Sequence, residues 1–546
     1  MNALRWDAEW RETSWAQLDG PWDIVVVGGG ITGAGVLRAA ARSGLRALLL
    51  ERADFSHGAS SRSSQLVHGG LRYLAQGHLR VTRDAVHSRE RLLREAPGLV
   101  TPLPFLIPLR ADRARERIAN LAALRLYEAL AGRAGRLAVR PGEVLTLAPA
   151  LDRTGLRGGL RYHEARTDDA RLVMRVLREA VALGALALNA VAVTDVVSAR
   201  GRVRGVRVLD RPTGRTGEVR ADVVVNATGA WADDLRRQVG GSPRMRPVAG
   251  SHLVFPGWRF PLAPGVNVRS PRDGRYVSVF PWEGATVVGT TDVDVGRLVE
   301  EQSITADEVT YLLECVSAAF PTLALTEADV LSTWSGVRPI VSSGARSSAD
   351  ELREHVVGDE GGLLTVTGGK LTTFEVAARE VLRAAAPNLQ PGRQLPPTTA
   401  ARPPGAPPAD DKGRRLYGRH GREAGDVLAD ARPGEQGRIT GTPTTWAEVR
   451  WSARNEAVTS IDDLMLRRTR LGLLLPDGGN RVLGSVLQIC REELGWDAVR
   501  ADQELGHYLA KVRRTHSIPS RAGMPVSPAE IHSSVTDNGR SGSTSS

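Results

Sequence analysis

Short apolar runs alternate with a helical pattern over the first fifty residues of the chain. Residues 23–27 (DIVVV) and 46–50 (RALLL) are compact runs of mostly aliphatic side chains. Between them, apolar residues recur with a helical period from about 32 to 43. Runs this short and this apolar are typical of parallel strands that are buried on both faces. The pattern therefore predicts a strand–helix–strand unit that opens an α/β fold.

Longer amphipathic patterns and alternating patterns follow downstream. Helices are expected at 82–96, 111–132, 168–183, 305–318, 446–468 and 482–493. Strands are expected at 185–197, 201–209 and 221–229, and a proline-rich extended segment at 97–108. Alternating runs at 250–255, 275–281 and 286–291, with turn residues between them, predict an antiparallel sheet.

These patterns divide the chain into domains and connecting segments. A discontinuous nucleotide-binding domain is expected over 21–95, 160–240 and 333–388, and a substrate-side domain over 96–159 and 241–332. Proline-rich residues 389–410 resemble a linker, and residues 411–515 are expected to form a helical domain. Residues 1–20 are expected to be a loosely attached leader, and 516–546 a disordered tail.

Composition and charge restrict the classes of function. The net charge of +11 comes from arginines spread along 546 residues, without a nucleic-acid motif, so no nucleic-acid partner is expected. No apolar run is long enough to span a membrane, and no secretory signal opens the chain. Cys315 and Cys490 support neither a disulfide framework nor a metal site. The chain is therefore expected in the reduced cytoplasm, without a metal.

The first strand ends in GGGITG, a G-x-G-x-x-G motif that includes Thr32. Gly28 allows the tight turn, Gly30 lets a pyrophosphate approach the backbone, and Gly33 lets the helix pack closely on the strand. The second strand ends at Glu51, where a carboxylate can accept hydrogen bonds from a ribose. This context predicts an adenine dinucleotide and disfavours NADP, while FAD and NAD both remain open.

Three further stretches of small polar residues have the character of ligand-facing loops rather than solvated ones. The first, at 57–74, contains Ser60, Ser61, Ser63, Ser64, His68, Gly69 and Gly70. The second ends a buried strand at Ala227, Thr228 and Gly229. The third is a strand, a turn and a helix start at Gly369, Lys370, Leu371 and Thr372. Lysines are rare in this chain, and a lysine, unlike an arginine, can lose its proton when it is desolvated.

The order and content of these motifs resemble a known family. The chain carries SSRSSQLVHGGLRYL, RTDDARLV, NATGAWADDL, GSHLVF, VVGTTD, WSGVRPI, REHVV and TGGKLTTF, and later WAEVRWSARNEAVTSIDDLMLRRTRLGLL. Over residues 20–515 it is similar to the FAD-dependent, respiratory or aerobic glycerol-3-phosphate dehydrogenase family. It departs from many members at Gln65, where they carry lysine, and in the polar segment at 339–353.

The resemblance implies a fold and a reaction. The fold is α/β (α+β overall), with a Rossmann-like FAD-binding domain of the D-amino-acid-oxidase/glutathione-reductase type, an antiparallel-sheet substrate domain and a C-terminal helical domain. The reaction is oxidation of sn-glycerol 3-phosphate to dihydroxyacetone phosphate, by hydride transfer from C2 to flavin N5. Electrons are then expected to pass to a quinone, because an insertion found in some oxidase relatives is absent; O₂ is the alternative acceptor.

The resemblance also implies roles for individual residues. Arg72, Arg338 and Arg353 are candidates to bind the substrate phosphate, together with the hydroxyl of Tyr73. Three residues are candidates for the base that takes the C2 hydroxyl proton: His68, which is favoured, His252 and Lys370. Lys370 could instead place a positive charge beside the reduced flavin.

Two other functions remain as alternatives. The nearest is a related FAD enzyme of the same fold that acts on an amine or a 2-hydroxy acid. The other is a non-catalytic flavin- or nucleotide-sensing module whose C-terminal helices bind a partner. A quinone reductase without a spanning helix is expected to associate peripherally with the inner face of the cell membrane, through apolar and basic surface near residues 110–125 or in the C-terminal region. A homodimer is possible.

Overall fold

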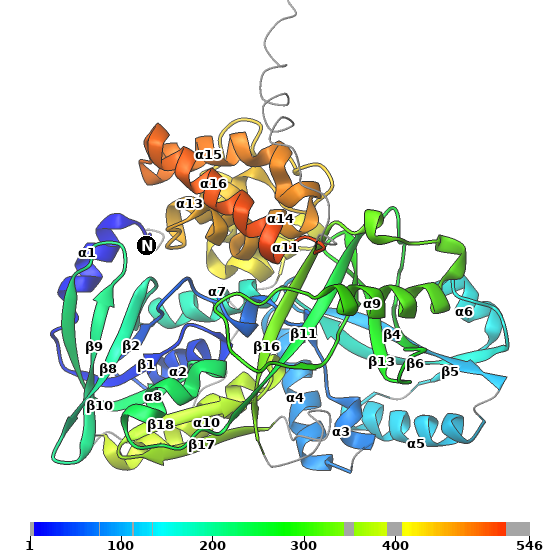
Figure 1. Cartoon of the computed structure of the whole chain (residues 1–546), viewed down its shortest axis with the longest axis horizontal. Coiled ribbons are helices and arrows are strands. Elements are labelled where there is room, and N and C mark those ends of the chain that lie inside the picture. Colours follow the sequence, from blue (N-terminus) through cyan, green and yellow to red (C-terminus); the bar gives the residue numbers. More distant parts are fainter. Residues whose placement is uncertain are drawn as a thin grey trace, which may run out of the picture.

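Two β-sheets lie side by side beneath a cap of C-terminal helices (Figure 1). The computed structural model describes residues 5–75, 77–111, 114–133, 135–342, 354–389 and 407–519. Within this part of the chain, no helix is both long and apolar enough to cross a bilayer.

The first sheet is built around the strand that precedes the glycine motif. Its strands run in the order β17, β18, β10, β1, β2, β7, and β8 and β9 form a hairpin that continues β10. Their bounds are β1 (Trp22–Val27), β2 (Ala47–Leu50), β7 (Leu186–Leu188), β8 (Val191–Ala199), β9 (Arg202–Asp210), β10 (Thr216–Asn226), β17 (His355–Glu360) and β18 (Leu363–Gly368). β1 and β2 are parallel and buried along their whole length, which confirms the predicted opening unit.

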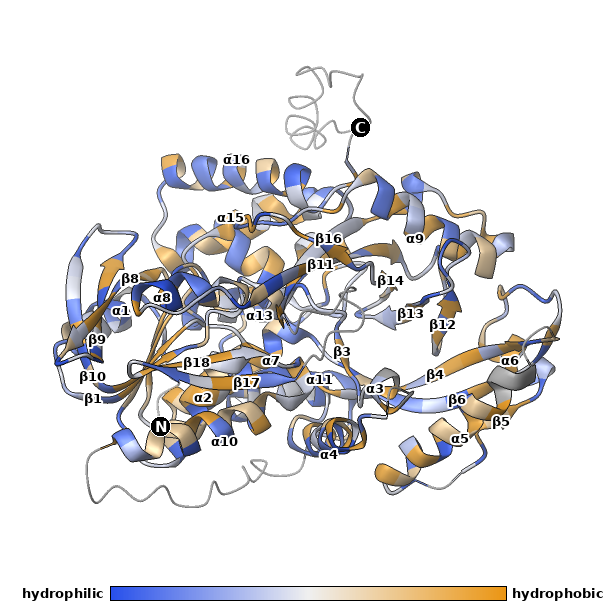
Figure 2. Cartoon of the chain, turned by 60° about the horizontal axis from the view of Figure 1, so that its bottom comes forward, coloured by the Kyte–Doolittle hydropathy of each residue, from blue (hydrophilic) through white to orange (hydrophobic). Residues whose placement is uncertain are grey.

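Helices cover one face of this sheet, and the β8–β9 hairpin covers part of the other. On the first face lie α2 (Ile31–Arg42), α7 (Asp169–Val181) and α10 (Phe374–Ala385), whereas α8 (Ala232–Gln238) packs with the hairpin on the other face. α2 lies between α7 and α10 and buries its alanines against them, so close packing of small side chains holds this layer. The apolar strands inside the layers stand out in Figure 2.

The second sheet is mostly antiparallel, which confirms the antiparallel sheet predicted from the alternating runs. Its strands are β3 (Leu66–Val67), β4 (Thr101–Arg110), β5 (Ala138–Val139), β6 (Leu156–Arg166), β11 (Met245–Pro256), β12 (Gly265–Arg269), β13 (Tyr276–Trp282), β14 (Ala285–Gly289), β15 (Val293–Asp294) and β16 (Ser332–Val341). The predicted domain boundaries at 160 and 333 fall inside β6 and β16. β16 pairs with β11 along its whole length, so it belongs to this sheet.

Helices also cover the second sheet. α9 (Ala306–Ala319) packs on one face, where Leu312 and Val316 are fully buried. The other helices of this region are α3 (Leu71–Ala75), α4 (Leu79–Glu95), α5 (Ala114–Leu130) and α6 (Pro141–Leu147). The predicted helices at 82–96, 111–132, 168–183 and 305–318 are thus all present, with ends shifted by a few residues.

The C-terminal helices form the predicted helical domain and share a core with the second sheet. They are α11 (Asp411–His420), α12 (Ala424–Ala429), α13 (Trp446–Asn455), α14 (Leu471–Leu474), α15 (Asn480–Leu494) and α16 (Ala498–Thr515). The helix predicted over 446–468 is interrupted: α13 ends at Asn455, and a π-helical turn follows at Asp463–Arg468. Trp334 of β16 and Tyr508 of α16 belong to one buried cluster, so this domain is fused to the sheet beneath it.

The described parts of both predicted terminal segments contain packed residues. Residues 5–20 are not loosely attached, because they form α1 (Ala8–Ala16) and bury Trp6 to 1% exposure. The carbonyl of Trp6 accepts a hydrogen bond from the Ala457 amide at 3.0 Å, which ties the N-terminus to the C-terminal domain. His516, predicted to lie in a disordered tail, is buried. Residues 390–406 of the predicted linker and 520–546 of the tail lie outside the described residues.

Candidate active site

A cavity of about 910 Å³ is lined by residues from both sheets. Its walls are the carboxyl ends of β1, β2 and β10 on one side and strands β11, β12, β13 and β16 on the other. Ligands of open α/β sheets bind at the carboxyl ends of the strands. The residues predicted for the site that line the cavity are Gly28, Gly30, Thr32, Glu51, Ser60, Ser63, His68, Gly70, Tyr73, Ala227, Thr228, Gly229, His252, Arg338, Gly369, Lys370, Leu371 and Thr372.

The glycine turn after β1 has the geometry of a pyrophosphate cradle. Gly28 has φ +112°, and a Cβ placed there would lie 2.6 Å from the Ala227 carbonyl oxygen. Gly33 lies behind the wall, where a Cβ would come within 1.9 Å of the Gly28 carbonyl oxygen. Gly30 caps α2, and the next amide, that of Ile31, donates to Ser60 Oγ at 2.9 Å. Gly30, Ile31 and Thr32 all line the cavity, so the N-terminus of α2 faces it and favours an anion there.

Glu51 lies at the carboxyl end of β2, where the sequence predicts a ribose contact. Its carboxylate accepts hydrogen bonds from the Gly29 amide at 2.6 Å and the Ala53 amide at 2.8 Å. Burial raises the pKa of Glu51, and the two backbone hydrogen bonds oppose that rise. A carboxylate has about four lone-pair sites, so two bonds leave capacity for ligand hydroxyls.

The turn after β10 forms the next part of the wall. Asn226 accepts hydrogen bonds from both the amide and the hydroxyl of Thr228, and Gly229 has φ +64°. Trp231, which follows this turn, also lines the cavity, and the guanidinium of Arg52 lies 4.7 Å from its ring centroid.

In the serine- and glycine-rich stretch at 57–74, some residues line the cavity and others pack behind its wall. Ser60 and Ser63 line the cavity, whereas Ser61 lies behind its wall. Gly69 also lies behind the wall: its amide donates to Glu164 at 3.0 Å, and a Cβ would lie 2.3 Å from the hydroxyl of Tyr127. Gly69 therefore allows close packing rather than a ligand contact.

Two stretches that are 300 residues apart in sequence meet at the far end of the cavity. Lys370 Nζ lies 3.5 Å from the ring centroid of Tyr73. The hydroxyl of Thr372 donates to the carbonyl oxygen of His68 at 3.2 Å. The structure thus brings together the HGGLRY and GGKLT motifs, including two of the three candidate bases.

His252, the third candidate base, is on β11 and lines the same cavity. Its Nε2 lies 2.9 Å from Ser64 Oγ, and its ring stacks on Trp334 with centroids 5.0 Å apart. Burial lowers the pKa of His252 to about 3, and the nearby positive charge of Arg338 contributes. The imidazole is therefore neutral at physiological pH.

Cationic side chains from the second sheet surround this end of the cavity. Arg338 on β16 donates to Thr290 Oγ1 at 2.9 Å and forms an ion pair with Asp292. Arg275 pairs with the same carboxylate at 2.8 Å, and Arg269 lies nearby with its guanidinium 4.6 Å from the Tyr276 ring centroid.

Sequence reasoning missed several residues that line the cavity: Arg52, Arg62, Glu164, Asn267, Arg269 and Arg275. Two of them had a weak signal in the sequence, because Arg269 and Arg275 stand on either side of the turn between β12 and β13. Two predicted phosphate ligands have no described side chain. Arg72 is on α3, but its side chain lies outside the described part of the structure, as does the whole of Arg353.

The residues present fit an FAD molecule. The glycine turn leaves room where side chains would collide with backbone, and Glu51 lies where a ribose is expected. The volume lies near the upper end of the roughly 300–1,000 Å³ range of ligand pockets. An elongated dinucleotide would therefore occupy the glycine-lined side and leave the arginine-lined side for a substrate.

Two family models together match most of the chain. One, described as FAD dependent oxidoreductase, matches residues 23–381. The other, described as the C-terminal domain of alpha-glycerophosphate oxidase, matches residues 404–501.

Individual relatives match over similar lengths. The chain is 34% identical to glycerol-3-phosphate dehydrogenase 2 of Mycobacterium tuberculosis over 532 residues, covering 92% of this chain and 90% of that protein. It is 35% identical to the aerobic glycerol-3-phosphate dehydrogenase of Staphylococcus haemolyticus over 370 residues, 66% of each. The structure of glycerol-3-phosphate dehydrogenase from Bacillus halodurans complexed with FAD has a TM-score of 0.75 and 28% identity, covering 93% of this chain and 98% of that one. This chain belongs to the FAD-dependent glycerol-3-phosphate dehydrogenase family.

Proposed function

We propose that the protein oxidises sn-glycerol 3-phosphate at C2 to dihydroxyacetone phosphate. The observation that carries this proposal is the division of one cavity into two ends. One end is a glycine-lined dinucleotide cradle, and the other gathers Arg338, Arg275 and Arg269 beside candidate bases. A carboxylate substrate would need one cationic clamp, whereas a phosphate dianion is better matched by several arginines.

FAD, when bound, supplies the hydride acceptor, the flavin N5 atom. The protein's own residues must hold the substrate, take the C2 hydroxyl proton and exclude water. Arg338 is the proposed main phosphate ligand, with the Tyr73 hydroxyl as a second. Asp292 orients Arg338 in the absence of substrate and also binds Arg275, so both guanidinium groups are held near the same place.

His68 is the proposed base. His252 fits this role less well, because its Nε2 already contacts Ser64 and its pKa of about 3 makes it a weak proton acceptor. Lys370 is more suited to supply positive charge, since its ammonium group lies over the face of Tyr73 as a cation–π pair.

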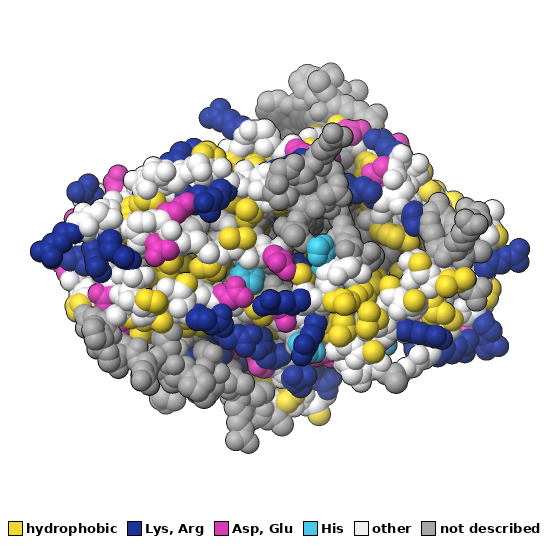
Figure 3. Space-filling view, turned by 90° about the horizontal axis from the view of Figure 1, so that it is seen from below, with side chains coloured by type: hydrophobic (Ala, Val, Ile, Leu, Met, Phe, Trp, Pro, Cys, Tyr) yellow, Lys and Arg dark blue, Asp and Glu magenta, His cyan; other side chains and the backbone are white. Residues whose placement is uncertain are grey.

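The proposed electron acceptor is a quinone, reached by peripheral association with the cytoplasmic face of the membrane. This part of the proposal is supported by exposed apolar side chains on two adjoining helices. Leu79 of α4 is 55% exposed, and Ile118 and Leu126 of α5 are 74% and 44% exposed. Figure 3 views the molecule from the side on which these helices lie, where hydrophobic side chains occur among lysine and arginine side chains.

Anaerobic spectroscopy of the purified protein tests the proposal. A yellow protein that is bleached by glycerol 3-phosphate, but not by D-alanine or lactate, is the expected result. A flavoprotein that is bleached by an amine or a 2-hydroxy acid instead would contradict the substrate assignment. Reoxidation of the bleached protein then identifies the acceptor: a soluble quinone analogue is expected to restore the colour faster than air does.

A further inference from the structure

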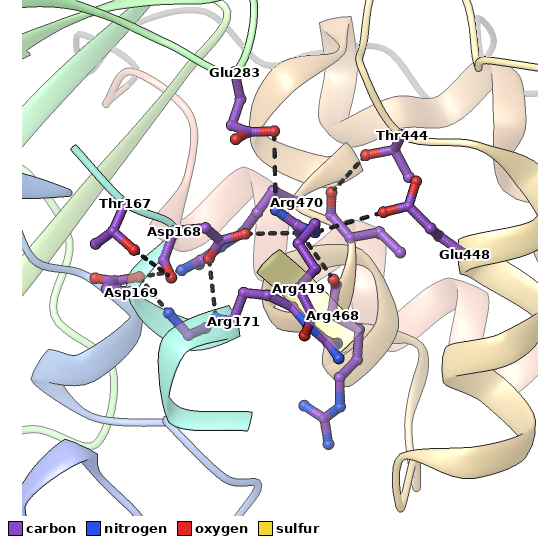
Figure 4. Close-up of polar contacts among 12 residues, drawn as sticks. Thr167, Asp168, Asp169, Arg171, Glu283, Arg419, Thr444, Glu448, Arg468 and Arg470 are labelled. Carbon is purple, nitrogen blue, oxygen red and sulfur yellow. Dashed lines mark hydrogen bonds and ion pairs between the residues drawn. The ribbon is translucent and has the colours of Figure 1, made fainter. Parts of the chain in front are cut away.

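Arg470 connects the C-terminal domain to the loop that borders the cofactor cavity. It follows the π-helical turn, adopts the left-handed conformation with φ +63°, and is only 1% exposed. Its Nε donates to Asp168 at 3.0 Å, and its Nη2 forms an ion pair with Asp169 (Figure 4). Its Nη1 donates to the carbonyl oxygen of Ser61 at 3.0 Å and to that of Leu466 at 2.8 Å. Every guanidinium nitrogen is therefore in use.

The loop that Arg470 holds spans residues 60–65. Besides the direct bond to Ser61, Asp169 accepts a hydrogen bond from the Ser63 amide at 2.9 Å. The Asp169 amide in turn donates to the Gln65 side chain at 3.0 Å. Arg470 thus fixes the loop once directly and twice through Asp169.

The two ends of this loop carry side chains that face the cavity. Ser60 accepts the hydrogen bond from the Ile31 amide at the mouth of the cradle, and Ser64 contacts His252. Trp334 of the second sheet donates to the Ser63 carbonyl oxygen at 3.1 Å, so the middle of the loop is held from the opposite side as well. A shift of the loop would therefore move groups at both ends of the site.

The electrostatics of the pair of aspartates explain why a guanidinium is needed. Burial opposes ionisation of Asp168, but Arg470 and Arg419 outweigh it and lower its pKa to about 2. Burial raises the pKa of Asp169, the neighbouring charge of Asp168 adds to this rise, and Arg470 opposes it. Without Arg470, two adjacent buried carboxylates would lose a shared counter-charge, and the Ser61 carbonyl would lose a donor.

We infer that Arg470 is a positioning residue for the cofactor loop, through which the C-terminal domain completes the FAD site. The domain would then be a structural part of the flavin site rather than an appended partner-binding module. This inference rests on FAD occupying the cavity and does not depend on the identity of the substrate.

Arg171 offers a matched control. It is as deeply buried as Arg470, and it also joins the two domains, through an ion pair with Glu456 and a hydrogen bond to the Arg419 carbonyl. Within the described structure its hydrogen bonds and ion pairs do not reach residues 60–65. Loss of Arg171 should therefore weaken domain docking without releasing the loop directly.

The test measures FAD affinity separately from thermal stability, using full-length Arg470→Met, Arg470→Lys and Arg171→Met. Apoprotein is reconstituted with FAD, the Kd is obtained from flavin fluorescence, and the absorbance spectrum of the bound flavin is recorded. Arg470→Met is expected to raise the Kd for FAD about tenfold or more and to shift the flavin spectrum. Arg171→Met is expected to lower the Tm while leaving the Kd within about twofold of the parent.

Arg470→Lys keeps a positive charge beside Asp168 and Asp169, so the inference can still be tested if Arg470→Met fails to fold. A lysine cannot reach both carboxylates and Ser61 at once, and an intermediate Kd is expected. The inference is overturned if Arg470→Lys binds FAD as tightly as the parent with an unchanged spectrum. It is equally overturned if Arg171→Met weakens FAD binding as much as Arg470→Met does. Failure of glycerol 3-phosphate to bleach the loaded parent protein would refute the proposed function alone.

Discussion

Arg338 has a protein carboxylate as its partner in the absence of substrate. Asp292 is buried, accepts from both Arg338 and Arg275, and so keeps two guanidinium groups at one end of the cavity. A phosphate dianion arriving there could bind the donors of both groups that do not face Asp292. The pair of arginines, rather than either one alone, would then set the affinity for phosphate.

Replacement of Arg338 tests this arrangement. Arg338→Met is expected to raise the KM for glycerol 3-phosphate by roughly 10- to 100-fold, because a charge-assisted hydrogen bond contributes about 1.5–3 kcal/mol. FAD content should stay unchanged. Arg272→Met is the control, since Arg272, like Arg338, forms ion pairs with carboxylates, here those of Asp307 and Glu314, but is not among the cavity-lining residues. Steady-state kinetics decide the matter: equal KM values for the two variants would contradict a phosphate contact for Arg338.

Replacement of the proposed base, His68, gives a second prediction about a single residue. His68→Ala is expected to slow substrate-dependent flavin reduction by about 10²- to 10⁴-fold, the usual contribution of general base catalysis. FAD should remain bound, because the Thr372 contact uses the His68 backbone carbonyl and survives the substitution. Anaerobic stopped-flow absorbance measures the rate. Near-parent reduction in His68→Ala, with slow reduction in a parallel His252→Asn variant, would move the base to His252.

Residues inside compact motifs could be predicted, and residues outside them could not. Gly28 and Gly33 could be predicted because an added Cβ at either position would collide with backbone atoms, so few residues other than glycine fit there. Arg269 and Arg275 could not, since dozens of arginines look alike in a sequence and only the fold brings these two to the cavity. Gly69 lies in a motif but has a packing role that depends on Tyr127, a residue on a distant helix.

At the scale of elements, the contact between β1 and α2 depends on one missing side chain. A Cβ on Gly33 would lie 1.9 Å from the Gly28 carbonyl oxygen, so Gly33→Ala must push the helix away from the turn. The expected cost is about 1–3 kcal/mol of stability, together with loss of FAD binding. Gly484→Ala in α15 is the opposite case, because no atom of the described residues lies within 4 Å of its added Cβ. That variant should gain about 0.5–1 kcal/mol. Tm and flavin content after purification check both outcomes, and a flavin-replete Gly33→Ala protein would contradict the close-packing role.

A pair of hydrogen bonds attaches the end of α16 to β16 and holds His516 in a buried site, which makes the stability of the fold depend on pH in acid. His516 Nδ1 lies 2.9 Å from the Thr333 carbonyl oxygen, and the Thr333 amide donates to the His516 carbonyl at 2.8 Å. Burial lowers the pKa of His516 to about 3, with Arg62 contributing, whereas the unfolded chain protonates near 6.5. Between these values only the unfolded state binds the proton. The free energy of unfolding therefore falls as pH drops from about 6.5 towards 3, by up to about 1.4 kcal/mol per pH unit.

His516→Gln removes this titration. In urea unfolding, the variant is expected to lose about 1 kcal/mol at pH 7.5, from the Nδ1 hydrogen bond, and to show a shallower decline between pH 6.5 and pH 5. His252 has the same kind of shift and is unchanged, so part of the decline should persist. Parallel declines in the parent and the variant would mean that His516 is not buried in its neutral form.

Helices and strands with strong hydrophobic periodicity were predicted correctly, but the contacts between them could not be predicted from the sequence. The alternating runs identified an antiparallel sheet, but they did not show that β16 pairs with β11, because strands so far apart in sequence carry no local signal of their pairing. The helix expected over 446–468 also breaks where tertiary contacts intervene: Asp463 accepts hydrogen bonds from the Thr459 and Ser460 backbone ahead of the π-helical turn. Such contacts override local helical preference.

At the scale of the whole molecule, the C-terminal domain is joined to both sheets. Its apolar side chains share a core with the second sheet, and buried arginines connect it to the first. The sequence showed that this region is helical and charged. It did not show that arginines such as Arg468 and Arg470 are buried, because charged residues are fully buried only when distant partners pair with them.

The proposed association with a membrane is a property of the whole surface and gives the last prediction. Ile118 and Leu126 lie on α5 with the exposed Arg125, and α4 beside it carries the exposed Leu79, Arg80 and Arg83. Apolar side chains can enter the headgroup region while arginines bind anionic lipid, so both terms should contribute to binding.

The protein is expected to co-sediment with vesicles that contain anionic lipid at low salt, and much less with neutral vesicles. Binding should weaken at high salt, since salt screens the electrostatic term. Ile118→Asp should reduce binding, whereas Trp258→Asp, at a residue that is 82% exposed between β11 and β12, should not. Equal loss in the two variants, or no binding by the parent under low-salt anionic conditions, would refute α4 and α5 as the membrane-facing surface.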